Sequence, residues 1–187
     1  MTERGLEALD PQVTSLTAVL RKPVQVWYLE MASPEELRSA APVEAQIEVV
    51  EDPAVNRRFY EQVGRAHHWV DNLGRDDDWW AEHAAGKTTL VARMDGEPAG
   101  YATLNPLPDG SVDVAYFGIL PRFQGRGLGG HLLTEAVRMA WDMGAERVTL
   151  NTCALDGPGA LPNYRRRGFV VVREAIEERG VSDLAAS

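Results

Sequence analysis

The spacing of apolar residues predicts two long helices. Apolar and aromatic residues recur every three or four positions over 56–73 and again over 128–143, which is the pattern of a helix with one buried face. Each stretch stops at a glycine, Gly74 or Gly144, and glycine commonly follows the last turn of a helix. We therefore predict amphipathic helices over both stretches.

Shorter runs of β-branched and aromatic residues predict strands elsewhere in the chain. The turn signals Asp95-Gly96 and Pro108-Asp109-Gly110 are expected to join three successive strands into an antiparallel meander. The predicted strands lie at 24–31, 47–50, 88–94, 99–107, 111–120, 147–153 and 169–174, and shorter helical patterns lie at 75–86 and 159–167.

The order of these elements predicts the fold class. The segment 111–153 reads as strand, helix and strand, so its two strands are expected to be parallel. We predict an α/β fold of the mixed α+β kind, in which helices flank a twisted, mostly antiparallel sheet with one parallel β-α-β unit. Residues 1–22 show only weak helical periodicity and are predicted to form a flexible extension, with 23–187 as one domain.

Composition excludes several classes of protein. The 187 residues contain no apolar run near the ~18 residues of a membrane span, and the N-terminus lacks the apolar segment of a secretory signal. The single cysteine, Cys153, can form neither an internal disulfide nor a multi-cysteine zinc site, so it is interpreted as a small buried residue. The net charge of -9 disfavours binding to nucleic acid. We expect a cytoplasmic protein without membrane or nucleic-acid partners.

Charge is distributed unevenly along the chain. Residues 111–179 hold nine arginines and eight carboxylates, a net of +1, whereas residues 1–110 hold ten basic and nineteen acidic residues, a net of -9. Either this difference is ordinary surface variation, or the two halves face ligands of opposite sign.

A glycine-rich segment at 124–130 (Gln-Gly-Arg-Gly-Leu-Gly-Gly) lies between a predicted strand and a predicted helix. Glycines let the backbone approach a bulky anion, and the free N–H groups at a helix start point toward it. Arg122 and Arg126 add charged donors. The segment therefore predicts an anion site, and the alternative is a flexible turn without a ligand.

The spacing Gly125-x-Gly127-x-x-Gly130 also matches the dinucleotide fingerprint, but its context differs. Four residues, 121–124, separate the strand from the first glycine, and the preceding strands are predicted to be antiparallel. No Gly-Lys-Ser/Thr follows, which excludes a P-loop. A dinucleotide-dependent oxidoreductase is thus the weaker alternative.

The segment instead resembles motif A of the GNAT superfamily of N-acetyltransferases, Gln/Arg-x-x-Gly-x-Gly/Ala. It reads Gln124 to Gly129 here, and the family's closing motif, a tyrosine four residues before Gly-Phe, reads Tyr164 to Phe169. The similarity spans about 87–174. It implies a GNAT-like sheet and transfer of an acetyl group from acetyl-CoA to a primary amine, by direct attack in a ternary complex and without a metal. A non-catalytic acyl-CoA-binding module on the same fold is an alternative, and the resemblance leaves a homodimer open.

The resemblance also implies which residues hold acetyl-CoA. Main-chain groups of the strand before the turn would pair with the pantetheine arm, amides of the turn would bind the pyrophosphate, and Asn151 is a weaker polar candidate. Gly157 stands where the family often has a polar residue, which puts side-chain contacts from that loop in doubt. The implied cofactor-binding residues are Phe117, Ile119, Gln124, Gly125, Arg126, Gly127, Leu128, Gly129, Gly130 and Asn151.

Two residues are implied as catalytic. Tyr164 matches the family's general acid, because a phenol of pKa ~10 can protonate a thiolate whose thiol has a pKa of ~8.5. Asp113 is the candidate base, since it lies on the strand where some members carry a glutamate. The alternatives are a core tyrosine for Tyr164, and for Asp113 a solvated carboxylate, with positioning alone supplying the rate gain.

The acceptor is expected to lie against the first long helices. Segments 67–71 (His-His-Trp-Val-Asp) and 76–80 (Asp-Asp-Asp-Trp-Trp) place aromatic rings beside carboxylates, which suits a small cationic amine. The alternative is that the tryptophans are core residues and that the aspartates cap a helix. His67 and His68 are not expected to bind a metal, because neighbouring helix positions diverge.

Overall fold

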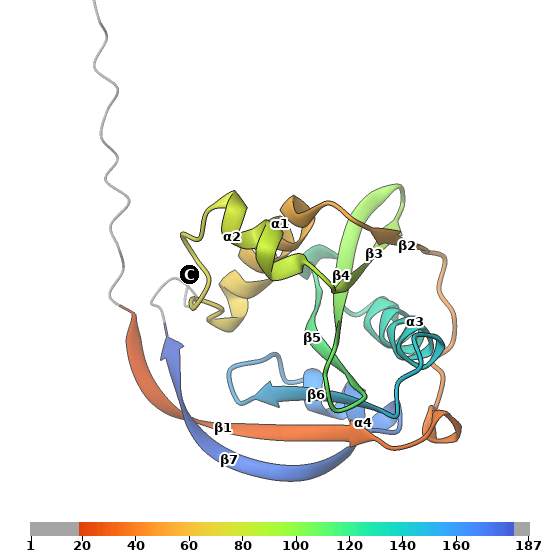
Figure 1. The fold of residues 1–187 in the computed structure, drawn as a ribbon. Coiled ribbons are helices and arrows are strands. Elements are labelled where there is room, and N and C mark those ends of the chain that lie inside the picture. The colour runs from red at the N-terminus through yellow and green to blue at the C-terminus, as the bar shows by residue number, and fades with distance from the viewer. Residues whose placement is uncertain (1–18, 182–187) are drawn as a thin grey trace, which may run out of the picture.

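The computed structural model describes residues 19–181, in which seven strands form one sheet. From edge to edge the sheet order is β2-β3-β4-β5-β6-β1-β7 (Figure 1). The strands are β1 (Leu20–Met31), β2 (Gln46–Val50), β3 (Thr88–Met94), β4 (Glu97–Pro106), β5 (Ser111–Ile119), β6 (Arg147–Cys153) and β7 (Val170–Val181). The helices are α1 (Pro53–Gly64), α2 (Asp77–Ala84), α3 (Leu128–Asp142) and α4 (Ala160–Arg166), with short 3-10 turns at Pro34–Glu36, Arg65–His67 and Pro121–Phe123.

The pairing of the strands confirms the predicted fold class. Every neighbouring pair is antiparallel except β5 and β6, which are parallel and joined through α3. The turn between β3 and β4 places both Asp95 and Gly96 at positive φ, 56° and 79°, as a two-residue hairpin turn requires.

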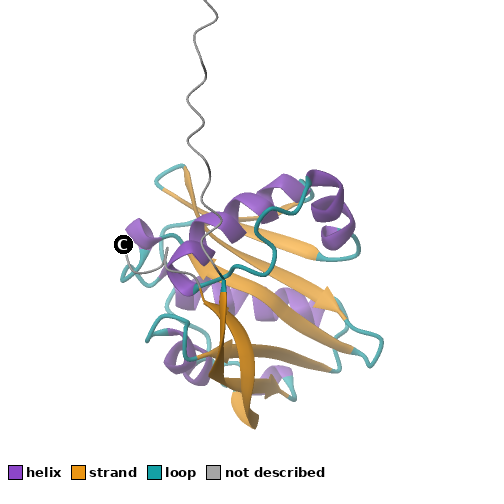
Figure 2. Ribbon diagram, turned by 90° about the vertical axis from the view of Figure 1, so that its left-hand side faces the viewer, coloured by secondary structure: helices purple, strands orange, loops and turns teal. Residues whose placement is uncertain are grey.

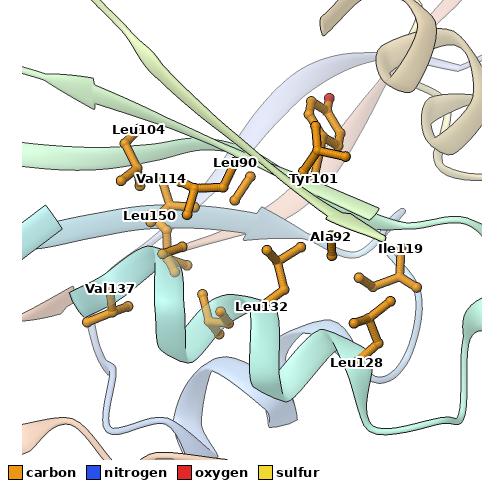
Figure 3. Close-up of a cluster of buried hydrophobic side chains, with 14 of the residues drawn as sticks. Leu90, Ala92, Tyr101, Leu104, Val114, Ile119, Leu128, Leu132, Val137 and Leu150 are labelled. Atoms are coloured by element: carbon orange, nitrogen blue, oxygen red, sulfur yellow. The ribbon is translucent and has the colours of Figure 1, made fainter. Parts of the chain in front are cut away.

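Apolar side chains cover both faces of the sheet. On one face α3 presents Leu128, Leu132 and Val137 to the inward residues of the central strands, whereas Tyr101 points to the opposite side (Figure 3). On that opposite face Phe59 of α1 stacks on Tyr101 at a centroid distance of 4.8 Å. Helices α1 and α2 therefore lie on one side of the strands and α3 on the other (Figures 1 and 2).

The helix predicted over 56–73 is wrong in its length, because α1 ends at Gly64. The chain turns back there: His68 takes a left-handed conformation with φ 56°, and the Trp69 amide donates to the Gly64 carbonyl at 3.0 Å. A Cβ on Gly64 would come within 2.5 Å of Trp69, so the glycine permits this close approach. The predicted stop at Gly74 lies nine residues too late, since the residue that follows α1 is Arg65.

The two ends of the described chain also differ from prediction. Strand β1 begins at Leu20, so residues 20–22, which were assigned to a flexible extension, are part of the sheet. Residues 1–18 lie outside the described range, and the predicted division into extension and domain stays a prediction. Strand β7 runs to Val181 rather than to 174, because it pairs with β1 along almost its whole length. None of the described helices is long and apolar enough to cross a membrane.

Candidate active site

A cleft opens where β5 and β6 separate. Residues Ser111–Asp113 of β5 pair with Arg147–Thr149 of β6, and beyond these residues the two strands diverge. The resulting cleft has a volume of about 730 Å³ and is lined by β5, the glycine-rich turn, the end of β6, α4 and the segment between α1 and α2. The motifs identified in the sequence therefore meet at one site.

A bulge in β5 sets which side chains face the two halves of this cleft. Thr103 of β4 is opposite Tyr116, but the next residue, Leu104, is opposite Val114, so Ala115 is the extra residue. Tyr116 lies on the α1 face, while the neighbouring Phe117 contacts Tyr164 of α4, with ring centroids 6.0 Å apart. Both Phe117 and Ile119, predicted from the resemblance, line the cleft.

The glycine-rich turn borders the cleft with its backbone. Gly125 and Gly127 have positive φ values of 75° and 81°, and Gly127 is the N-cap of α3 without any side chain to cap the helix. The first-turn N–H groups therefore stay available for an anion. The lining residues of this segment are Gln124, Gly125, Gly127, Gly129 and Gly130.

Two residues of the predicted turn direct their side chains away from the cleft. Arg126 is hydrogen-bonded to Asp95 at 3.1 Å, and the side chain of Leu128 is 1% exposed in the core. The role that the resemblance implies for their backbone amides stays a prediction. The expectation that the Arg122 and Arg126 side chains donate to the anion is not met, because they pair with Glu97 and Asp95 and do not line the cleft. Asn151 lines the cleft from β6, as does Gly157 from the following loop.

Two polar residues of α4 that the sequence did not single out also line the cleft. Asn163 donates to the carbonyl of Gly129 at 3.4 Å and so ties α4 to the start of α3. Arg166 adds a positive charge at the same border. The sequence signal that could have identified them is their position beside Tyr164 in the closing motif.

Tyr164 lies in the cleft wall and is only 7% exposed. Its ring contacts Phe117 and Phe169, which fixes its orientation. Burial, and secondarily the negative charge of Asp156, raises the pKa of the Tyr164 phenol well above its ordinary value. The hydroxyl therefore carries its proton throughout the physiological pH range.

The structure does not bring Asp113 to the cleft. It lies on β5 where β5 is still paired with β6, outside the residues that line the cleft. Its carboxylate accepts a hydrogen bond of 2.8 Å from Thr149, and burial raises its pKa. The geometry thus places the candidate base apart from Tyr164 and the glycine-rich turn.

The opposite end of the cleft is aromatic. Tyr60, Trp69 and Tyr116 pack against one another with centroid distances of 5.6 to 6.0 Å. Asp71, two residues after Trp69, lines the same end; its side chain is 56% exposed and pairs with Arg21 at 3.7 Å. The predicted His67 and His68 also line it, whereas Trp80 is a core residue with 2% exposure.

Two other carboxylates expected near the acceptor, Asp76 and Asp77, do not line the cleft. The Asp76 side chain accepts from the Trp79 amide at 2.9 Å and caps α2, and Asp77 forms an ion pair with Arg57 at 2.6 Å. The alternative interpretation of this segment, a helix cap, therefore holds for Asp76.

Polar groups from the end of β6 and the loop after it also line the cleft. Cys153 is half-buried and lines the cleft, and burial raises the pKa of its thiol, so it is not the fully buried residue expected. Asp156 accepts from the hydroxyl of Thr152 and the amide of Cys153, at 2.6 and 3.0 Å. Within residues 19–181 no group of three or more His, Cys, Asp or Glu side chains could hold a metal ion.

Known structures share this fold. A GCN5-related N-acetyltransferase from Sphaerobacter thermophilus superposes with a TM-score of 0.66 at 19% identity, covering 88% of this chain and 55% of that one. One from Kribbella flavida gives 0.63 at 23% identity, covering 86% and 60%. This chain thus spans little more than half of either protein. A GNAT family acetyltransferase from Elizabethkingia anophelis, solved with acetyl-CoA bound, gives 0.55 at 17% identity and covers 71% and 80%.

Comparison at the level of sequence places the chain in a family. No curated protein matches it. The sequence model of the acetyltransferase (GNAT) family matches residues 53–169, which is more than half of the chain and contains both motifs. The chain therefore belongs to the acetyltransferase (GNAT) family.

Proposed function

We propose that this chain transfers an acetyl group from acetyl-CoA to a primary amine, the acceptor being a small cationic molecule. The observation that carries the proposal is the single cleft that joins the uncapped start of α3, the separated edge of β5 and Tyr164. A phosphate-bearing thioester needs all three features: an anion site, a strand edge for its extended arm and a proton donor at the sulfur.

The glycine-rich turn is proposed to hold the pyrophosphate. Its backbone N–H groups and the dipole of α3 favour negative charge, and no side chain competes for them at Gly127. A Cβ on Gly125 would meet nothing within 4 Å, so the surrounding space is open to a ligand. The pantetheine arm would then follow the main chain of β5 past Phe117 and Ile119.

The proposed reaction is direct. The lone pair of the neutral amine attacks the thioester carbonyl carbon, the C–S bond breaks, and the Tyr164 hydroxyl gives its proton to the departing sulfur. The amine has by then lost two protons in all from its ammonium form. One of them restores the Tyr164 hydroxyl and the other leaves the site, so the products are an amide, a thiol and one released proton.

The aromatic end of the cleft supports a cationic acceptor. The rings of Trp69 and Tyr116 can attract a cation, and the carboxylate of Asp71, which also pairs with Arg21, adds a negative charge beside them. Since the same cleft holds Phe117 and Tyr164, an amine bound there would lie toward the thioester.

Calorimetric titration with CoA and acetyl-CoA, followed by thiol release with tyramine, agmatine and spermidine, tests the proposal. We expect saturable binding below about 1 mM and turnover with at least one amine. Binding without turnover would favour the non-catalytic acyl-CoA-binding module. No binding at millimolar CoA would overturn both.

A further inference from the structure

A hydrogen-bonded chain leads from the acceptor end of the cleft into α2. Tyr116 lines the cleft, and its hydroxyl lies 2.9 Å from Nε2 of His83. The side-chain amide of Asn72 donates to the same hydroxyl oxygen at 3.0 Å. Two side chains, one from α2 and one from the segment before it, thus converge on the hydroxyl oxygen of this β5 residue.

One tautomer of His83 gives this chain an arrangement of protons that can relay a proton away from the cleft. A phenol has one proton and two lone pairs, and one lone pair of Tyr116 already accepts from Asn72. Burial, and then the nearby charge of Lys87, lowers the pKa of His83, so its ring is neutral near pH 7. Burial raises the pKa of Tyr116 to about 12, so the phenol keeps its proton. In the His83 tautomer whose Nε2 carries no proton, the phenol donates that proton to Nε2. The second lone pair of Tyr116 remains for a group in the cleft.

We propose that Tyr116 and His83 form the relay that takes the proton from the acceptor ammonium before it attacks. The inference rests on the proposed function. The N–H bond of the ammonium breaks and its proton passes to the Tyr116 oxygen, while the Tyr116 proton passes to Nε2 of His83. The amine is left neutral, and the imidazolium returns to neutrality by losing its Nδ1 proton to water. Proton exchange of the neutral ring with water then restores the tautomer with unprotonated Nε2 before the next turnover.

The surroundings of His83 hold its ring in place for this step. Trp79 stacks on the ring at 4.3 Å and Trp80 meets it edge-on at 5.8 Å. Charged groups surround the relay: the Lys87 ammonium donates to the His83 carbonyl, and the charge of Asp71 acts on Tyr116. Asp71 in turn pairs with Arg21 at 3.7 Å, and Arg75 lies over the Trp79 ring at 5.2 Å. Lys87 disfavours the imidazolium, which speeds the loss of the proton to water.

The relay would supply the base that the sequence analysis assigned to Asp113. Asp113 is bonded to Thr149 at the closed end of β5, whereas Tyr116 lies three residues further along, beside the aromatic rings that would hold the acceptor. Because of the bulge at Ala115, Tyr116 is on the α1 face and can reach α2.

The test compares the wild type with His83→Gln and Tyr116→Phe, using acetyl-CoA and tyramine from pH 7 to pH 10. At pH 7 we expect each variant to lose roughly 100-fold in kcat/KM for tyramine, with the KM for acetyl-CoA unchanged. The deficit should shrink toward pH 10, where bulk water deprotonates the amine. The matched control is His131→Gln, at a half-buried histidine of α3 outside the cleft lining, which should retain wild-type rates.

An equal loss at every pH, or no loss, would overturn the relay. A second measurement does not depend on turnover: nitrogen-15 NMR of the His83 ring should show Nε2 without a proton at pH 7, and Tyr116→Phe should change the pKa of the ring. A protonated Nε2 at pH 7, or an unchanged pKa, would contradict the relay. Absence of acetylation with every amine would refute the proposed function instead.

Discussion

Neighbouring residues of β5 have different partners because the strand turns successive side chains to opposite faces. Tyr116 contacts the aromatic rings of the acceptor end, and Phe117 contacts Tyr164 on the other side. The strand therefore lies between the proposed site of amine deprotonation and the proposed site of thiol release.

Tyr164→Phe tests the second of these sites. Loss of the hydroxyl is expected to lower kcat by about 100-fold or more and to leave the Kd for CoA unchanged, because the ring still packs against Phe117 and Phe169. Steady-state rates and calorimetry with CoA provide the two values. An unaltered kcat would show that Tyr164 donates no proton.

The pH profile of the wild type gives a further expectation for Tyr164. Because burial raises the pKa of this phenol, the protonated form persists to higher pH than for an exposed tyrosine. We therefore expect that ionisation of Tyr164 does not lower kcat with saturating tyramine at any pH below 10. A decline centred near pH 8 that is lost in this variant would contradict the raised pKa.

For single residues, the sequence predicted which of them line the cleft better than it predicted where their side chains point. The motif spacing was sufficient to find Gly125, Gly127 and Tyr164, since each needs only a chain position. It could not show that the Arg126 side chain turns to Asp95, or that Asp113 stays at the closed end of β5. Those facts depend on strand register and on a hairpin 31 residues away in the chain.

At the scale of elements, the site depends on the start of α3 and on the bulge in β5. The periodicity of the sequence predicted α3 within one residue of its observed bounds, because a long apolar stripe and a flanking glycine define it. The bulge at Ala115 left no such signal. The break of α1 at Gly64 depends on Trp69 folding back, a tertiary contact that overrides the helical pattern.

Two glycines at opposite ends of α3 allow a matched test of the turn. Gly125 and Gly144 both have positive φ, 75° and 85°, and a Cβ on either would meet nothing within 4 Å. Gly125→Ala and Gly144→Ala should each lower the free energy of unfolding by about 1–2 kcal/mol, measured by urea denaturation.

Only the variant at the cleft should affect the cofactor. We expect Gly125→Ala to weaken CoA binding by about tenfold in calorimetry, equivalent to about 1.4 kcal/mol, and Gly144→Ala to leave the Kd unchanged. Equal Kd values for both variants and the wild type would place the pyrophosphate elsewhere.

At the scale of the whole molecule, the cleft lies between the two parts of the chain that differ in charge. Residues 111–179, with a net of +1, supply the glycine-rich turn, α4 and Tyr116, and the more acidic first part supplies Asp71, Tyr60 and Trp69. The position of β1 between β6 and β7 could not be predicted, because the pairing joins residues more than 100 positions apart.

The division of charge predicts a preference among acceptors. Asp71→Asn should raise the KM for agmatine several-fold and change the KM for acetyl-CoA little, whereas Asp78→Asn, at an exposed residue outside the cleft lining, should have no effect. The difference should diminish in high salt, since the Debye length falls from about 10 Å at 0.1 M to about 3 Å at 1 M. A KM that is independent of both salt and Asp71 would assign the negative charge to solubility alone.

The most direct test of acetyl transfer in this cleft is the stoichiometry of one reaction. Protein, acetyl-CoA and agmatine are incubated together, free thiol is measured by colour reaction, and acetylated agmatine is measured by mass spectrometry. We expect one acetylated amine for each thiol released, with a rate that saturates in acetyl-CoA and falls in Tyr164→Phe. Thiol release without acetylated amine, or neither product at millimolar acetyl-CoA with agmatine, tyramine and spermidine alike, would contradict it.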